Sequence, residues 1–322
     1  MKNILIIGGL GFIGSNLAHV LIKKGFKVTI IDAELDPYGW NYFNIRSIRE
    51  KIKYKKIDIR DKNSISSAVK GKDVIFNFAG QVSRLISLEN PELDIDINVK
   101  GSIIVLEAVK MYAPDAKVIF AGSRGQTGEP LYLPVNEEHP DNPTDIYGIN
   151  KLTAEKYHKL YFDVYDVKTT VFRINNVYGP RCQMKHGHYG VLNLFIGWAL
   201  QNMPLTVFGD GNQTRDYIYI DDLINAFLKI MDNPETDGQS YQVGSGIETR
   251  FIDMVNIICE TVGKGEIVFQ SFPDTLDKID IDRFVSSFDK LKNTTGWTPN
   301  VSLEKGISKT VEYYQKNLGD YL

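Results

Sequence analysis

Tyr147 and Lys151 are the residues of this sequence whose types and spacing most directly suggest chemistry. They lie four positions apart, so on a helix they are neighbours on one face. A free tyrosine has a pKa of about 10, and a nearby ammonium group favours its phenolate. A phenolate can take a proton from a hydroxyl group. The pair therefore predicts a general base, although the same spacing also occurs on ordinary surface helices.

A glycine-rich turn near the N-terminus predicts a dinucleotide site. Four apolar residues precede Gly8, and a helical pattern follows over residues 15–24. Gly8 allows a sharp turn, Gly11 lets a pyrophosphate approach the backbone, and Gly14 lets the helix pack against the strand. The helix N-terminus then faces the anion. Taken alone, such a turn also serves as a plain connection between strand and helix.

Asp32 ends a second apolar strand over residues 26–31. A carboxylate at this distance from the glycine turn accepts hydrogen bonds from the adenosine ribose hydroxyls. It repels a 2'-phosphate, and no arginine follows immediately to attract one. The position favours NAD over NADP, whereas the alternative is an aspartate that caps a turn.

The elements that must position these residues alternate regularly between strand and helix. Further strands are expected over residues 53–57, 74–77, 117–121 and 169–172, and helices over 62–69, 95–111 and 147–161. This order predicts an α/β fold with a doubly wound parallel sheet. Ligands bind at the carboxyl ends of such strands. That rule selects Gly8, Asp32, Asp58, Ala79, Gly80, Ser123 and Asn176.

The whole chain has 322 residues, enough for one large α/β domain or two unequal ones. A formal net charge of −3 gives no sign of a nucleic-acid or membrane-surface partner. Two cysteines, without a signal peptide or a long apolar span, predict a soluble cytoplasmic protein without disulfides. His186 and His188 have no third ligand nearby, so we expect no metal site.

The chain resembles the extended short-chain dehydrogenase/reductase family, in its nucleotide-sugar epimerase and dehydratase branch. The resemblance covers nearly the whole length and rests on residues 8–14, Asp32, 58–61, Asn98, 147–151, 173–181, 215–222 and 296–299. It implies a Rossmann-type NAD-binding domain over residues 1–173, to which parts of 210–235 return. A smaller C-terminal α/β domain over 174–322 would mainly bind a nucleotide sugar.

The resemblance also implies which residues contact NAD. These are Gly8, Gly11, Phe12, Ile13, Asp32, Asp58, Ile59, Phe78, Ala79, Gly80, Gln81, Asn98, Tyr147 and Lys151. The family more often has a histidine and two alanines where this chain has Ala79, Gly80 and Gln81. The form found here is similar to C2-epimerases that act on CDP-sugars, although packing alone also accounts for one varied glycine.

The same resemblance assigns the substrate contacts. Ser123 would hydrogen-bond the reacting sugar oxygen and complete a catalytic set with Tyr147 and Lys151. Arginine suits a diphosphate because its planar fork meets two phosphate oxygens. The expected substrate-binding residues are Arg84, Ser123, Asn176, Arg215 and Arg283. For Arg84 a solvated side chain, and for Arg283 a local ion pair, are the alternatives.

The segment after Ser123 departs from one branch of the family. Nucleotide-sugar 4,6-dehydratases carry an Asp-Glu pair there to expel the C6 hydroxyl, whereas this chain has Arg124 and Gly125. We therefore expect an NAD-dependent epimerase that oxidises the sugar transiently, with C4 as the expected carbon. A dehydrogenase that releases the ketosugar is the alternative, a dehydratase comes third, and an NAD-binding sensor or scaffold is the non-enzymatic reading.

Quaternary structure is expected from two of the helices. In the family, the helices that correspond to residues 95–111 and 147–161 pair across a two-fold axis. The resemblance therefore implies a homodimer. The alternative use of their apolar faces is packing on the sheet.

Overall fold

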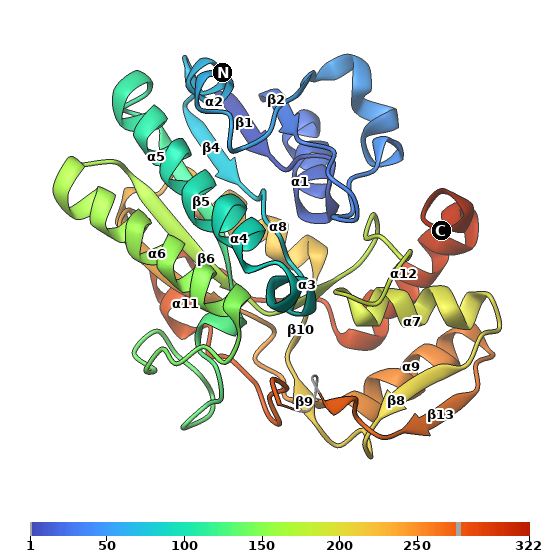
Figure 1. Cartoon of the computed structure of the whole chain (residues 1–322). Coiled ribbons are helices and arrows are strands. Elements are labelled where there is room, and N and C mark those ends of the chain that lie inside the picture. Colours follow the sequence, from blue (N-terminus) through green and yellow to red (C-terminus); the bar gives the residue numbers. More distant parts are fainter. Residues whose placement is uncertain (1, 275–277) are drawn as a thin grey trace.

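A seven-stranded parallel sheet forms the centre of the molecule (Figure 1). The computed structural model describes residues 2–274 and 278–322. The strand order is β11-β6-β5-β4-β1-β2-β3, which confirms the doubly wound α/β fold. The strands are β1 (Asn3–Ile7), β2 (Lys27–Asp32), β3 (Lys53–Lys56), β4 (Val74–Asn77), β5 (Lys117–Ser123), β6 (Thr169–Ile174) and β11 (Gln239–Val243).

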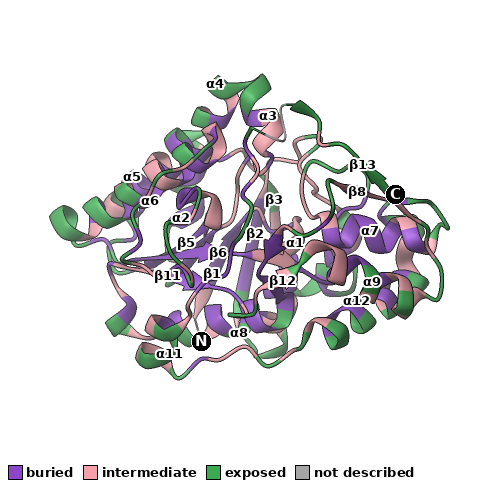
Figure 2. Cartoon of the chain, turned by 90° about the horizontal axis from the view of Figure 1, so that it is seen from below, coloured by how far each residue is buried: buried purple, intermediate pink, exposed green. Residues whose placement is uncertain are grey.

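Helices cover both faces of this sheet. The apolar side chains of β1 point alternately to the two faces, and each face therefore needs a cover that buries them. Ile4 and Ile6 belong to a core with α1 (Phe12–Lys23) and α8 (Ile220–Ile230). Leu5 and Ile7 belong to a second core on the opposite face. That core includes side chains of α2 (Lys62–Val69), α5 (Gly101–Tyr112) and α6 (Ile146–Tyr165). Figure 2 shows the buried sheet between helices whose outer faces are exposed.

The segment that precedes α5 differs from the single helix expected over residues 95–111. It consists of α4 (Pro91–Asp94) and a π-helical turn, η2 (Ile95–Lys100), before α5 begins. A π turn widens the helix locally, and such turns are frequent at functional sites. Gly101 then packs on Ile59, where an added Cβ would lie 2.8 Å from the isoleucine side chain.

A second lobe lies beside the carboxyl ends of the central strands (Figure 1). Its helices are α7 (Val191–Leu200), α9 (Phe251–Val262) and α12 (Leu303–Asn317), and it contains the parallel pair β8 (Leu205–Phe208) and β13 (Ile267–Gln270). Two short pairs join the lobes, β7 (Asn176–Tyr178) with β10 (Tyr217–Tyr219) and β9 (Thr214–Arg215) with β12 (Thr249–Arg250).

Short elements complete the chain. They are η1 (Tyr42–Lys51), α3 (Arg84–Glu89), η3 (Arg124–Gln126), η4 (Pro234–Thr236), α11 (Asp289–Thr295) and η5 (Leu318–Asp320). Within the described residues, every helix is too short or too polar to cross a membrane. The division into domains at residue 173 stays a prediction.

Candidate active site

A cavity of about 490 Å³ opens at the carboxyl ends of the central strands and extends to the second lobe. The residues that the strand-end rule selects all lie in its wall. Its wall includes most of the residues expected to bind cofactor or substrate. These are Gly8, Gly11, Phe12, Ile13, Asp32, Asp58, Ile59, Phe78, Ala79, Gly80, Arg84, Ser123, Tyr147, Lys151 and Asn176.

The glycine turn forms one end of this cavity. Gly8 has φ +81°, and a Cβ added there would lie 2.8 Å from the backbone nitrogen of Ala79. A Cβ on Gly14 would lie 2.4 Å from the carbonyl oxygen of Gly8, so the helix can start this close only with glycine. Gly11 precedes α1 without a side-chain cap. The first N–H groups of α1 are thus left for an anion such as a pyrophosphate.

Two carboxylates follow at the ends of the next strands. Asp32 accepts hydrogen bonds from the backbone N–H groups of Leu10 and Glu34, both at 3.0 Å. Burial raises the pKa of Asp32, and these N–H groups lower it. Asp58 is held by the fork of Arg60 at 2.9 and 2.6 Å, which lowers the pKa of this carboxylate. Asp32 is therefore fixed in place with lone pairs left for a ribose.

The expected catalytic residues converge on the same cavity. Ser123 ends β5, and Tyr147 and Lys151 lie one turn apart on α6. Asp145 fixes the start of α6 because its carboxylate accepts the backbone N–H of Gly148 at 2.7 Å. The structure thus brings a hydroxyl, a phenol and an ammonium group together.

Burial sets the ionisation of these groups. It raises the pKa of the Tyr147 phenol, while Ser123 and Arg124 act in the opposite direction. Arg124 is thus one cation that lowers this pKa. Burial lowers the pKa of Lys151 to about 8, and Asp94 partly offsets this effect. The ammonium nitrogen of Lys151 lies 4.5 Å from the centre of the Phe120 ring.

Gln81 and Asn98 lie behind the cavity wall. The side-chain amide of Asn98 donates to the carbonyl oxygen of Gln81 at 2.9 Å, and the side chain of Gln81 donates to Asp94 at 2.7 Å. A Cβ on Gly80 would lie 2.9 Å from Oδ1 of Asn98 and 3.4 Å from Nζ of Lys151. Gly80 thus makes room for both side chains beside the cavity.

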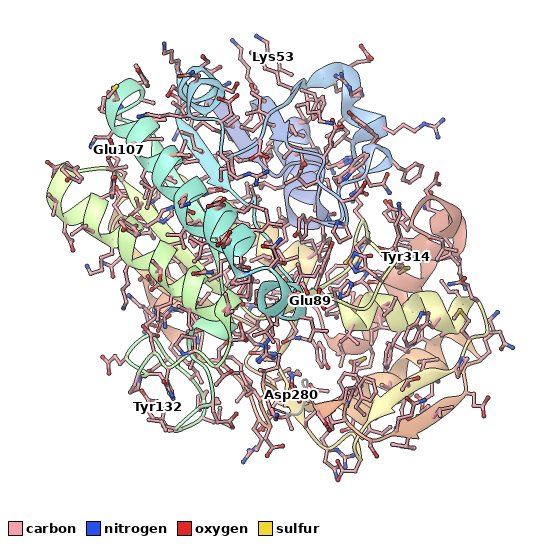
Figure 3. All side chains as sticks on the ribbon, viewed as in Figure 1. Lys53, Glu89, Glu107, Tyr132, Asp280 and Tyr314 are labelled. Atoms are coloured by element: carbon pink, nitrogen blue, oxygen red, sulfur yellow. The ribbon has the colours of Figure 1, made fainter. Side chains whose placement is uncertain are left out.

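The three predicted arginines have different surroundings. Arg84 pairs with Asp145 at 2.5 Å and lines the cavity. Arg215 is buried beside the cavity and pairs with Asp280 at 2.7 Å, where the two lobes meet (Figure 3). Arg283 is 58% exposed and pairs with Glu248, also at 2.7 Å. The ion-pair alternative for Arg283 thus describes its present contacts.

Sequence reasoning assigned no ligand contact to several other wall residues. Arg124 lines the cavity, and its Nε donates to Oδ1 of Asn176 at 2.9 Å. The sequence did indicate this contact, because Arg124 directly follows Ser123, which carries the expected catalytic hydroxyl. The loop over residues 33–40 also contributes to the wall, and a ring nitrogen of His186 lies 2.8 Å from the carbonyl oxygen of Pro37. The aromatic residues Tyr38 and Trp40, on either side of Gly39 in this loop, were the available sign.

Comparison with known proteins gives consistent matches over almost the whole chain. The family model described as GDP-mannose 4,6 dehydratase matches residues 5–310. A UDP-glucose 4-epimerase from Mycolicibacterium smegmatis is 33% identical over 97% of this chain and 98% of its own. A UDP-glucuronic acid decarboxylase 1 from Xenopus tropicalis is 31% identical over 98% of this chain and 73% of its own.

Solved structures agree with these matches. UDP-glucose 4-epimerase from Thermotoga maritima, solved with UDP-glucose, superposes with a TM-score of 0.90 at 32% identity, covering 98% of this chain and 99% of that one. UDP-glucose 4-epimerase from Thermus thermophilus, solved with NAD, gives 0.87 at 29% identity and coverages of 97% and 99%. The chain therefore belongs to the extended short-chain dehydrogenase/reductase family, in its branch of nucleotide-sugar epimerases, decarboxylases and dehydratases.

Proposed function

We propose that this protein is an NAD-dependent epimerase of a UDP-sugar, which it oxidises transiently at C4 and reduces again on the other face. The observation that carries this proposal is one cavity lined by Ser123, Tyr147 and Lys151 together with the glycine turn. Relatives and structural neighbours that are UDP-glucose 4-epimerases support the choice of reaction and nucleotide.

The cavity has the features that NAD requires. The uncapped start of α1 would hold the pyrophosphate through the N–H groups of Phe12 and Ile13, and Asp32 would accept the ribose hydroxyls. When bound, NAD supplies the acceptor and later the donor of hydride. The Thermus thermophilus neighbour, solved with NAD, supports this assignment.

Proton transfer falls to the residues of the chain. Tyr147 would take the proton of the sugar hydroxyl and return it after inversion, while Ser123 would hold the same oxygen in line. Because burial raises the pKa of Tyr147, the phenol is protonated in the chain alone. Cations near the phenol must therefore stabilise its charged form during the oxidation step. Arg124 already acts in that direction.

Inversion requires the ketosugar to present its second face to the same hydride carrier. Asn176 and Arg215 would anchor the diphosphate, so that only the sugar turns. The cavity of about 490 Å³ extends to Gly187 and Gly190, which leaves space beside the proposed sugar position. Epimerisation needs this space, whereas elimination of water would need an acid and a base where Arg124 and Gly125 stand.

A panel of UDP-sugars tests the proposal. The purified protein is incubated with UDP-glucose, UDP-galactose, their N-acetyl forms and UDP-glucuronate, and products are followed by NMR and mass spectrometry. We expect a C4 stereoisomer of unchanged mass and no net formation of NADH. A released ketosugar with accumulating NADH would indicate a dehydrogenase. A product lighter by water or by carbon dioxide would indicate a dehydratase or a decarboxylase.

A further inference from the structure

Arg124 has unused hydrogen-bond donors inside the cavity. Its Nε donates to Oδ1 of Asn176 at 2.9 Å, and its guanidinium carbon lies 5.3 Å from the centre of the Phe284 ring. Neither Nη group has a hydrogen-bond partner among residues 2–274 and 278–322. A guanidinium group has five N–H donors in a planar fork. Four of them therefore remain available to a ligand.

Arg124 also forms no ion pair with a carboxylate among the described residues. The neighbouring arginines are engaged, Arg84 with Asp145 and Arg215 with Asp280. In the described part of the chain, no carboxylate lies within 4.0 Å of Arg124. Burial, followed by Arg215 and Arg84, lowers the pKa of Arg124 to about 9, and Asp280 only partly opposes this effect. A buried charge without a partner is costly, and a bound anion would remove this cost.

We propose that Arg124 binds an oxyanion of the substrate, at the point where the cavity meets the catalytic hydroxyl of Ser123. The inference rests on the proposed function, because it requires a sugar nucleotide in this cavity. Nε fixes the orientation of Asn176 by occupying its amide oxygen, so the amide N–H₂ group of Asn176 is left to donate to the same anion. The two side chains then form one anion-binding unit.

Two substrate groups have the required chemistry. One is the phosphate that is joined to the sugar, which the contact with Asn176 favours. The other is a carboxylate on the sugar ring, as in a uronic acid, which the position directly after Ser123 favours. Both groups present two oxygens that a guanidinium fork can bind at the same time. The two possibilities predict different ligands whose affinity should fall when Arg124 is replaced.

Equilibrium binding to the NAD-loaded protein distinguishes the two sources. Dissociation constants for UDP, UDP-glucose and UDP-glucuronate are measured for the wild type, Arg124→Met and Arg124→Lys. If Arg124 binds the phosphate, the Met variant should weaken all three ligands by about 10- to 100-fold. If it binds a sugar carboxylate, only UDP-glucuronate should weaken by that factor. The Lys variant should lose less, because it keeps the charge but not the fork.

Arg250→Met is the matched control, because Arg250 is exposed and paired with Asp253 away from the cavity. Retained NAD and the thermal midpoint show whether each variant folds, and Arg124→Gln replaces the Met variant if that one does not. Unchanged dissociation constants for all three ligands would overturn the inference. Since binding needs no turnover, a protein that binds these ligands through Arg124 but does not epimerise them would contradict only the proposed reaction.

Discussion

At the scale of single residues, the chemistry of the cavity depends on the pKa of Tyr147, which burial raises and nearby cations lower. Burial and the carboxylates of Asp94 and Asp145 favour the neutral phenol, whereas Ser123 and Arg124 favour its ionised form. Without bound ligands, Tyr147 is therefore protonated at neutral pH. Bound cofactor and substrate must shift this balance for the residue to act as a base.

Replacing Tyr147 with phenylalanine should abolish most turnover while the fold and NAD binding are kept. Only the hydroxyl is removed, and general acid or base groups contribute roughly 10²- to 10⁴-fold. The measurement is kcat on whichever UDP-sugar of the panel is converted. Tyr157→Phe on the same helix is the control, because Tyr157 does not line the cavity. Near-wild-type turnover in Tyr147→Phe would mean that another group moves the proton.

Asp32→Asn should weaken NAD binding and reduce the preference of the protein for NAD over NADP. The carboxylate is held by two backbone N–H groups at the end of β2, and an uncharged amide would no longer repel a 2'-phosphate. Loss of hydrogen bonds to a charged acceptor predicts NAD binding weaker by about 10- to 100-fold. Titration of both cofactors checks this, with Asp163→Asn on the surface as the control. Tighter binding of NADP than NAD by the wild type would refute the assignment.

The residues of the site were predictable to different degrees. Gly8, Asp32 and Ser123 lie at strand ends, so local pattern and the strand-end rule place them correctly. The partners of the arginines could not be predicted, because pairs such as Arg215 with Asp280 join residues far apart in the sequence. The same holds for Arg124. Its lack of an ion pair among the described residues depends on where the fold places the carboxylates, which the sequence alone does not show.

At the scale of elements, α6 carries the proposed catalytic pair, Tyr147 and Lys151, and also the fully buried His158. His158 stacks on Phe120, with ring centres 4.5 Å apart, and its Nδ1 lies 2.7 Å from the carbonyl oxygen of Ala154. Burial lowers the pKa of His158 to about 4. The helix therefore holds a neutral imidazole under the active-site wall.

Acidification should destabilise the protein through His158. Between a pKa of about 6.5 in the unfolded chain and about 4 in the folded one, only the unfolded chain binds the proton, so stability falls as the pH drops through this window. From pH 7 to pH 5 this contributes about 2 kcal/mol. Urea unfolding at both pH values checks it, and His158→Phe should lose correspondingly less. Equal losses in wild type and variant would contradict the argument.

The positions of helices and strands were predictable where a periodic pattern of apolar residues marks them, and less so elsewhere. The first six strands of the sheet, and the helices expected between them, lie within a few residues of their expected positions because buried apolar runs and helical patterns mark them, whereas β11 was not expected. The π turn over η2 was missed, since helical periodicity does not distinguish the two hydrogen-bond patterns. α1 starts earlier than expected because Gly14 belongs to the helix rather than to the turn.

At the scale of the whole molecule, α5 and α6 lie side by side (Figure 1). Both helices leave apolar side chains exposed. Met111 is 63% exposed, Leu160 48% and Val164 57%. Leu160 and Val164 are four positions apart and so share one face of α6. Such a surface is suited to cover a second copy of the chain.

The protein should therefore be a homodimer, and Leu160→Glu with Val164→Glu should convert it to a monomer. Two buried charges on each side would oppose the association. Light scattering with size-exclusion chromatography measures the mass. Ile247→Glu is the control, because Ile247 is 61% exposed and lies outside α5 and α6. A monomeric wild type, or a dimer that the double variant leaves intact, would contradict this arrangement.

The central claim is that the sugar is oxidised and reduced at one carbon without leaving the protein. The most direct measurement uses a UDP-sugar deuterated at C4, chosen as the member of the panel that is converted, and follows the label by NMR and mass spectrometry. We expect a product with inverted C4 that keeps the deuterium at C4 and has unchanged mass. Deuterium in released reduced cofactor, or a product that has lost water or carbon dioxide, would contradict it.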